Sequence, residues 1–388
     1  MDQLTGMLRT YPWGSRTLIP ELRGLPAPSD RPEAELWFGA HPASPSTIDG
    51  RPLTELIAAD PEAALGRRVR ENFGDGLPFL LKLLAAAEPL SLQAHPSAEQ
   101  AAEGFARENE SGIAMEAPNR NYKDPSHKPE LIVALTDFTA MAGFRPLERT
   151  RELFDALSCP QLDRYLAFLE HDPEQEEANL RGLFTTWITI PSLARTELIE
   201  GVVTAARPLL DRGDWISEVL GNVLYLHEQY PGDVGVLGAL LLNHLHLSPG
   251  EAIYLDAGHL HAYISGLGVE IMANSDNVLR GGLTSKYVDV PELVKVLDFH
   301  SLADPVVRAN DGRYPVPAEE FSLTCHMLGG AGESSVTVDH DGPVIALCTA
   351  GELTLGGLAL VPGDAAWIPA SDPAVTATGQ GQLFIARA

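Results

Sequence analysis

The sequence predicts a mainly β protein that carries an inserted α-helical domain and ends in a second β domain. Short segments of alternating apolar and polar residues, divided by turns rich in glycine, proline and aspartate, occupy residues 1–144 and 236–388. From residue 145 to 235, apolar residues instead recur at i, i+3 and i+4, which is typical of amphipathic helices. A chain of 388 residues has room for two or three domains. We therefore expect a first β domain of residues 1–144 and 236–305, a helical domain of residues 145–235, and a C-terminal β domain of residues 306–388.

The composition disfavours several classes of function. The formal net charge is −26 and basic residues do not cluster, which argues against nucleic acid and anionic membranes as partners. No segment approaches the ~18 apolar residues of a membrane span, and the N-terminus lacks an apolar signal region, so we expect a cytoplasmic protein. Three widely spaced cysteines indicate reduced, structural thiols. A small anionic substrate would need a local group of lysines and arginines, which makes such a group informative.

The first polar pair lies in the N-terminal β segments. Residues 90–96 alternate cleanly and predict a strand with Ser91, Gln93 and His95 on one face. The apolar run before it, at residues 79–84, is interrupted by Lys82. Glutamine and histidine two positions apart can ligate a metal through an amide oxygen and an imidazole nitrogen, or can satisfy each other's hydrogen bonds. His41 precedes a proline and is expected to be structural.

A second polar pair opens the strand expected at residues 131–135. Lys128 and Glu130 are two positions apart and share a face, and Pro129 holds Lys128 in extended backbone. As an isolated surface ion pair these two residues would mean little.

The helical domain follows. The helical pattern covers several stretches separated by prolines at positions 160, 173, 191 and 231: residues 148–157, 161–169, 174–184 and 196–230.

The densest group of chemical side chains lies in residues 249–290. A Pro-Gly turn leads into a strand at residues 252–255, after which His259 and His261 point to the same side, where one or both can line a cavity. Carboxylates, a glycine pair and cations follow closely: Glu270, Asp276, Arg280, Gly281, Gly282 and Lys286. We expect a β-meander with a polar pocket on one side, followed by a short helix or connector at residues 291–300.

The C-terminal β domain repeats part of this pattern. Residues 362–369, Pro-Gly-Asp-Ala-Ala-Trp-Ile-Pro, overlay residues 249–256, as if one turn-strand unit were used twice. The overlay puts Asp372 opposite His259 and Ala374 opposite His261. We therefore expect the C-terminal domain to be jelly-roll-like and to lack a metal site.

Three distant strands thus each present polar residues at i, i+2. Folded onto one inner wall of a jelly roll, they would supply two imidazoles, a carboxylate and an amide oxygen, a set that suits Zn²⁺. Without the glutamine, the set would match the facial triad of iron oxygenases.

Several motifs resemble the type I mannose-6-phosphate isomerases, a family of zinc-dependent cupin-fold enzymes. The matching stretches are YPWGS from Tyr11, ELWFGAHP from Glu35, LPFLLKLL from Leu77, PLSLQAHPS from Pro89, NYKDPSHKPEL from Asn121, and HAYISGLGVEIMANSDNVLRGGLTSKYVDV from His261. The resemblance implies a cupin catalytic domain with one zinc per chain, held by Gln93, His95, Glu130 and His261. It also implies a catalytic arginine at Arg280, with Lys128, Glu270, Asp276, Lys82, Lys286 and Ser91 around the pocket.

The resemblance further implies conversion of mannose 6-phosphate to fructose 6-phosphate through an enediol, with a small phosphosugar as the substrate. We expect the chain to be a monomer. Arg280 would stabilise negative charge, and Lys82, Lys128 and Lys286 are candidates for binding the phosphate or the oxyanion. Glu270 and Asp276 both remain candidates for the general base. The alternatives are a non-catalytic cupin that binds sugar phosphates and an iron cupin oxygenase.

Overall fold

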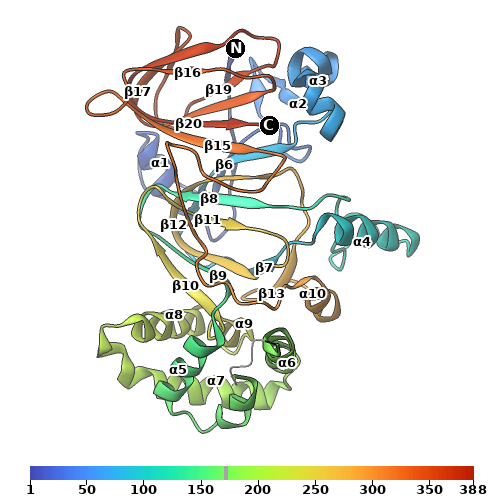
Figure 1. The fold of residues 1–388 in the computed structure, drawn as a ribbon, viewed down its shortest axis with the longest axis vertical. Coiled ribbons are helices and arrows are strands. Elements are labelled where there is room, and N and C mark those ends of the chain that lie inside the picture. Colours follow the sequence, from blue (N-terminus) through green and yellow to red (C-terminus); the bar gives the residue numbers. More distant parts are fainter. Residues whose placement is uncertain (170–173) are drawn as a thin grey trace.

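The protein has a mainly β, mixed fold arranged in three tiers (Figure 1). The computed structural model describes residues 1–169 and 174–388. The C-terminal sheet lies at one end with α2 (Leu53–Ala59) and α3 (Pro61–Phe73), and the helical block lies at the other end. The central strands stand between them, with α4 (Ala98–Glu110) projecting to one side.

The central tier is an eleven-stranded sheet organised around one long strand, β12 (His261–Ala273). The first half of β12 pairs with β7 (Leu92–Ala94) and β9 (Phe138–Phe144), and its second half pairs with β6 (Phe79–Ala86) and β8 (Glu130–Ala134). The remaining strands are β2 (Met7–Arg9), β3 (Glu35–Phe38), β10 (Leu242–Leu247), β11 (Glu251–Leu255), β13 (Leu279–Gly282) and β14 (Val306–Arg308). Because β12 belongs to both halves, residues at its start and near its end share one framework.

The helical block lies where the sequence predicts helices, but residues 163–169 form a 3-10 helix, the next helix ends at residue 188, and the longest predicted stretch is divided. The expected helical stretch at residues 196–230 is divided into α7 (Ser192–Ala206), η2 (Arg207–Arg212) and α8 (Trp215–Gln229). The division occurs because Pro208 begins a tighter turn and Gly213 adopts a left-handed φ of 68°. The elements are α5 (Leu147–Leu157), η1 (Asp163–Leu169), α6 (Glu176–Ile188), α7 (Ser192–Ala206), η2 (Arg207–Arg212), α8 (Trp215–Gln229) and α9 (Gly235–Gly238).

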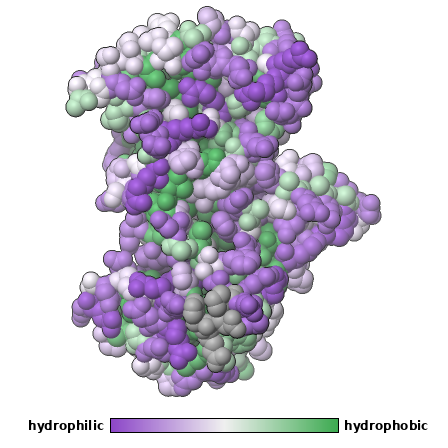
Figure 2. All heavy atoms as spheres, in the orientation of Figure 1, coloured by the Kyte–Doolittle hydropathy of each residue, from purple (hydrophilic) through white to green (hydrophobic). Residues whose placement is uncertain are grey.

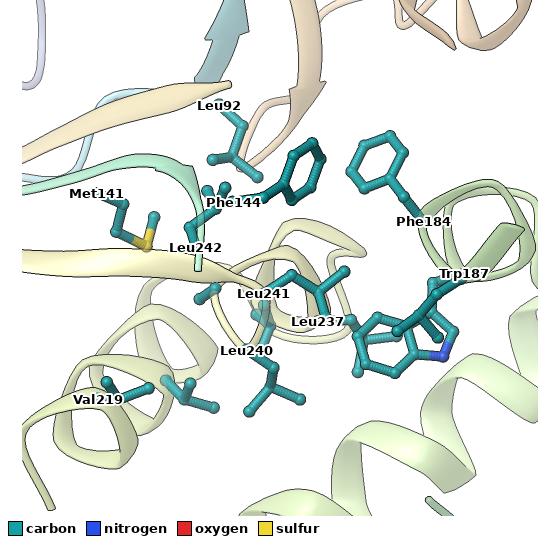
Figure 3. Packing of buried hydrophobic residues seen from close by; sticks show 14 of the residues in the cluster. Leu92, Met141, Phe144, Phe184, Trp187, Val219, Leu237, Leu240, Leu241 and Leu242 are labelled. Carbon is teal, nitrogen blue, oxygen red and sulfur yellow. The ribbon is translucent and has the colours of Figure 1, made fainter. Parts of the chain in front are cut away.

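A continuous apolar core joins these helices to the sheet (Figure 3). Phe144 at the end of β9 packs edge-on against Phe184 of α6, with ring centroids 5.8 Å apart. Leu240 and Leu241, which precede β10, are fully buried in the same cluster. The helical block is therefore docked on the sheet through close packing.

Two short strands lie across the domain boundaries that the sequence predicts. The N-terminal β1 (Asp2–Leu4) pairs with β19 (Ala365–Ile368) of the C-terminal sheet, because Leu4 is buried in a core that also contains Trp367. Conversely, β14 pairs with β11 and so belongs to the central sheet. Neither partner choice could be inferred from alternation alone.

The C-terminal sheet has the order β1-β19-β17-β20-β15. Strand β17 (Val344–Leu355) is continuous through a bulge between Cys348 and Ala350. The other strands are β15 (Ser322–Leu328), β16 (Val336–Val338), β18 (Leu358–Leu360) and β20 (Val375–Arg387).

The repeated Pro-Gly unit has the same local structure in both sheets. Gly250 and Gly363 adopt left-handed φ angles of 92° and 90°, and each turn leads into a strand, β11 or β19. A side chain would be strained at this φ, which explains glycine at both positions.

The remaining elements are short. They are α1 (Leu18–Leu22), α10 (Val290–Val296), which occupies the segment expected to be a helix or connector, and the hairpin β4 (Thr47–Ile48) and β5 (Arg51–Pro52). Hydrophilic side chains cover most of the face in Figure 2. None of the described helices combines the length and apolarity needed to cross a membrane.

Candidate active site

Three residues from different strands meet at a buried point of the central sheet. His95 follows β7, Glu130 begins β8 and His261 begins β12. Glu130 Oε2 lies 3.4 Å from His95 Nε2 and 3.7 Å from His261 Nε2, and all three side chains are at least nine-tenths buried. One ligand atom from each residue lies within 4.8 Å of the others, so the group could hold a metal ion.

Backbone carbonyls orient both imidazoles. His95 Nδ1 donates to the carbonyl of Asn277 at 2.7 Å, and His261 Nδ1 donates to the carbonyl of His259 at 2.9 Å. Both hydrogens therefore sit on Nδ1, which leaves the Nε2 lone pairs directed toward Glu130. His95 Nε2 is buried and has no hydrogen-bond partner among the described residues. A lone pair left without a partner in this setting fits a metal ligand.

The charges of the group also suit a divalent cation. Burial lowers the pKa of His95, and burial together with the neighbouring His95 lowers the pKa of His261 to about 3, so both rings are neutral. Burial opposes ionisation of Glu130, but Lys128, whose Nζ lies 2.8 Å from Glu130 Oε1, and His95 hold the pKa of Glu130 well below its ordinary range. Two neutral imidazoles and one carboxylate match the donors that Zn²⁺ takes.

Gln93 stands beside this group. It pairs directly with His261 of β12 and with Arg280 of β13, so the three side chains form a cross-strand row on one face. His259, in contrast, precedes β12, and its carbonyl supports His261. Of the two alternating histidines, only His261 belongs to the three-residue group.

A cavity of about 440 Å³ adjoins the group through Gln93, the cross-strand partner of His261, and Lys128, which is paired with Glu130. His95, Glu130 and His261 themselves do not line it. Of the residues that the sequence predicts around the pocket, those lining the cavity are Lys82, Ser91, Gln93, Lys128, Asp276, Arg280 and Lys286. Glu270 lies behind them, buried and 2.9 Å from Lys82 Nζ.

Two carboxylates balance the positive charge of Lys82. Its Nζ lies 2.9 Å from Glu270 and 3.6 Å from Glu35, and 5.4 Å from the centre of the Trp37 ring. Burial opposes the charge, but Glu270 and Glu35 raise the pKa of Lys82 above its ordinary value. Sequence reasoning missed Glu35 and Trp37, although their i, i+2 spacing on β3 is the same signal that singled out Gln93 and His95.

His41 and Asp276 form another pair at the cavity wall, with His41 Nε2 3.3 Å from Asp276 Oδ1. Burial opposes ionisation of Asp276, but the hydrogen bond with His41 and the nearby Lys128 lower its pKa below the ordinary value. Asp276 is therefore a carboxylate at neutral pH. The sequence predicts only a structural role for His41. It does not predict the contact with Asp276, because the two residues lie far apart in the chain.

Asn277 is a further residue that the sequence reasoning missed. Its side chain accepts from the N–H of Lys123 at 2.7 Å and donates to the carbonyl of Ser126 at 2.8 Å, while its own carbonyl orients His95. It is fully buried and ties a metal-ligand candidate to the loop that carries Lys128. No periodic pattern could have revealed it, because it lies between strands.

Arg280 and Lys286 differ from the other cations of the cavity. Among the described residues, neither forms an ion pair with a carboxylate, whereas Lys82 and Lys128 both do. Burial lowers the pKa of Arg280, and burial and Arg280 lower the pKa of Lys286. Such unpaired positive charges favour an anionic ligand.

Comparisons with known proteins agree with this geometry. A family model described as phosphomannose isomerase type I, catalytic domain, matches residues 1–147. The mannose-6-phosphate isomerase of Escherichia coli K12 is 38% identical over 99% of this chain and 98% of its own length, and that of Homo sapiens is 34% identical over 76% and 72%. A crystal structure of a mannose 6-phosphate isomerase bound with zinc and yttrium superposes with a TM-score of 0.88 and 36% identity, covering 100% of this chain and 99% of that one. The chain therefore belongs to the type I phosphomannose isomerase family.

Proposed function

We propose that this protein is a zinc-dependent aldose-ketose isomerase that interconverts mannose 6-phosphate and fructose 6-phosphate. The observation that carries the proposal is the His95, Glu130 and His261 group beside a cavity lined by Arg280, which has no carboxylate partner among the described residues. Relatives called mannose-6-phosphate isomerase match nearly the whole chain, which supports the same activity here.

The reaction moves a hydrogen between C1 and C2 of the sugar through an enediol. Gln93, His95, Glu130 and His261 would hold the zinc ion. When bound, zinc acts as a Lewis acid that polarises substrate oxygens and orients the sugar. The reaction also needs a base to move the proton and positive charges to stabilise the negative charges of the substrate, and residues of the cavity supply both.

The unpaired cations bind the negative charges of the substrate. Arg280 stands in the same cross-strand row as Gln93 and His261, so it stabilises the charge that develops on the enediolate. Lys286 is exposed at the cavity wall and receives the phosphate. Lys128, paired with Glu130, keeps that carboxylate ionised, and Ser91 offers the sugar a hydroxyl.

Asp276 is the better placed of the two candidate bases. It lines the cavity as a carboxylate oriented by His41, whereas Glu270 is buried and bonded to Lys82. In this assignment Asp276 takes the proton from C2 of the aldose and returns it to C1, while the hydroxyl proton on O2 passes to O1 as the carbonyl moves to C2. Glu270 keeps Lys82 charged and fixed.

The finer aspects of the fold and setting are part of the same proposal. The central strands form a cupin jelly roll, and the C-terminal sheet is a jelly-roll-like domain without a metal site. The three domains follow the boundaries given above, apart from β1 and β14. The chain works as a cytoplasmic monomer on a small phosphosugar, and its net charge of −26 disfavours nucleic-acid and membrane partners.

A coupled assay for fructose 6-phosphate, before and after chelation, tests the function. Isomerisation that stops on chelation and returns with zinc is the expected result. Sugar-phosphate binding without conversion would instead indicate a non-catalytic binding protein. Oxygen consumption that depends on iron would indicate an oxygenase.

A further inference from the structure

A second cavity lies where the helical block meets the central sheet. It measures about 230 Å³ and is bordered by the start of α5, by α8 and by β10. It shares no lining residue with the active-site cavity. The mechanism described above makes no use of it.

A buried guanidinium lines this cavity. Arg145 is 4% exposed and donates to the carbonyls of Leu240, at 2.9 Å, and Leu242. Within residues 1–169 and 174–388, no carboxylate lies at ion-pair distance from it, which is unusual for a buried charge. Burial and the nearby Arg149 lower the pKa of Arg145 to about 9, still above neutrality. An uncompensated buried cation favours an anion beside it.

More positive charge surrounds the same space. Arg149 lies over the Trp215 ring at 4.0 Å, and both line the cavity. The cavity also borders the first turn of α5, whose preceding residue, Pro146, provides no side-chain cap. The opposing charges are at the exposed side, where Glu218 lines the rim and Glu152 lies 3.3 Å from Arg149.

An unsatisfied imidazole nitrogen completes the lining. His244 Nδ1 is buried and has no hydrogen-bond partner in the described part of the chain. Its Nε2 lies 3.1 Å from His246 Nε2, and His246 Nδ1 lies 3.4 Å from Thr139 Oγ1. These groups can be chained so that Thr139 donates to His246 and His246 donates to His244. In that direction His244 Nδ1 carries a hydrogen with no acceptor, which an anion in the cavity would supply.

We propose that this cavity is a second binding site, specific for a small anion that carries a phosphate or carboxylate group. Arg145 and Arg149 supply the charge, and His244 donates a hydrogen bond from Nδ1. Trp215 limits the space, and the Arg149 guanidinium lies against its ring. Because α5, α8 and β10 all contribute, a bound anion ties the helical block to the sheet.

The test uses full-length protein with Arg280→Ala and Lys286→Ala, which weakens anion binding in the active-site cavity. Titration calorimetry with inorganic phosphate, and separately with acetate, is expected to show one saturable anion per chain. The tighter probe identifies the preferred group. Adding Arg149→Ala or His244→Gln is expected to weaken binding at least about fivefold.

Arg151→Ala is the matched control. Arg151 lies on the same helix and pairs with Asp155 at 3.1 Å as Arg149 pairs with Glu152, but it does not line the cavity. Unchanged affinity in this variant supports the site. The proposal is overturned if phosphate and acetate both fail to saturate, or if Arg149→Ala weakens binding no more than Arg151→Ala. Crystals soaked in selenate give an independent check, because a selenium peak beside Arg145 is expected and a peak only elsewhere would contradict the site.

Discussion

His95 and His261 are each oriented by a main-chain carbonyl, from Asn277 and His259 respectively. A carbonyl is only as well placed as the backbone that carries it. For His95, that backbone is held by the Asn277 side chain, which bonds to residues 123, 124 and 126. One buried amide therefore controls both the direction of a proposed zinc ligand and the loop before Glu130.

Replacing Asn277 with alanine should weaken zinc binding by about 10- to 100-fold, the usual effect of losing a residue that supports a metal ligand. Competition with a chelating dye measures the affinity. Asn274→Ala is the matched control, since Asn274 bonds to the Leu77 carbonyl and not to the ligand loop. Equal zinc affinities in the two variants would refute the role of Asn277.

Arg280 is expected to act on turnover without affecting the metal. Because it has no carboxylate partner among the described residues and faces the cavity, Arg280→Ala should lower kcat by about 10²- to 10³-fold, as for loss of one group that stabilises an oxyanion. Zinc content, measured by elemental analysis, should stay at one per chain. Arg280→Lys keeps the charge and should recover part of the rate. Near-normal turnover in Arg280→Ala would reject the assignment.

For single residues, the sequence predicts on which face of a strand a side chain lies, but not which residues from other parts of the chain it contacts. Alternation correctly puts Lys128 and Glu130 within reach of each other, at 2.8 Å. It could not show that the pair is buried, nor that His41 meets Asp276, because both depend on strands and loops far apart in the chain. The group of possible ligands was anticipated through the resemblance, which carries information about pairing that alternation lacks.

Among the elements, β12 connects the two halves of the site. His261 at its start pairs with Gln93 of β7, and Glu270 further along pairs with Lys82 of β6. The sequence predicts that these residues form a strand, but it does not predict that the strand pairs with β7 and β9 in its first half and with β6 and β8 in its second half. The change occurs at Gly266, with a φ of 122°, where a Cβ would lie 2.7 Å from the Asp137 carbonyl oxygen.

The Asp233 carboxylate links the helical block to the loop that carries Lys286. Asp233 Oδ1, just after α8, accepts from the N–H groups of Gly235 and Leu283, both at 2.7 Å. Leu283 has a left-handed φ of 54° and begins the loop that leads to Lys286. The bonds from Asp233 hold this loop in a conformation that a leucine rarely adopts.

Asp233→Ala should therefore release the loop that carries Lys286 and raise KM about five- to tenfold, corresponding to loss of backbone hydrogen bonds to a charged group. A much smaller change in kcat and unchanged zinc content are expected, since Arg280 lies on β13 and the ligands lie on strands or, for His95, directly after one. Asp233→Asn retains the acceptor oxygen and should behave nearly as the parent. Steady-state kinetics distinguish these outcomes, and an asparagine variant as impaired as the alanine one would contradict the hydrogen-bond explanation.

For the molecule as a whole, the net charge of −26 contrasts with the cations that line both cavities. The whole chain repels anions at long range, while Arg280 and Lys286 in one cavity, and Arg145 and Arg149 in the other, attract them at short range. Buried histidines and carboxylates of the first cavity then link the molecule's stability to pH.

Zinc-free protein should lose stability as the pH falls from about 6.5 toward about 3. The folded state holds His261 at a pKa of about 3, against 6.5 for an ordinary histidine, so the unfolded chain binds an extra proton in this window. The lowered pKa values of His95 and Glu130 act in the same direction, because each makes the unfolded chain the better proton acceptor. Each such group can contribute up to about 1.4 kcal/mol of unfolding free energy per pH unit.

Urea unfolding across this range measures how the free energy of unfolding changes with pH, and His261→Gln should make that slope shallower. Protonation of surface carboxylates also relieves repulsion in this acidic chain, so the parent and the His261→Gln variant must be compared with each other. Identical slopes in the two proteins would show that His261 does not titrate as inferred.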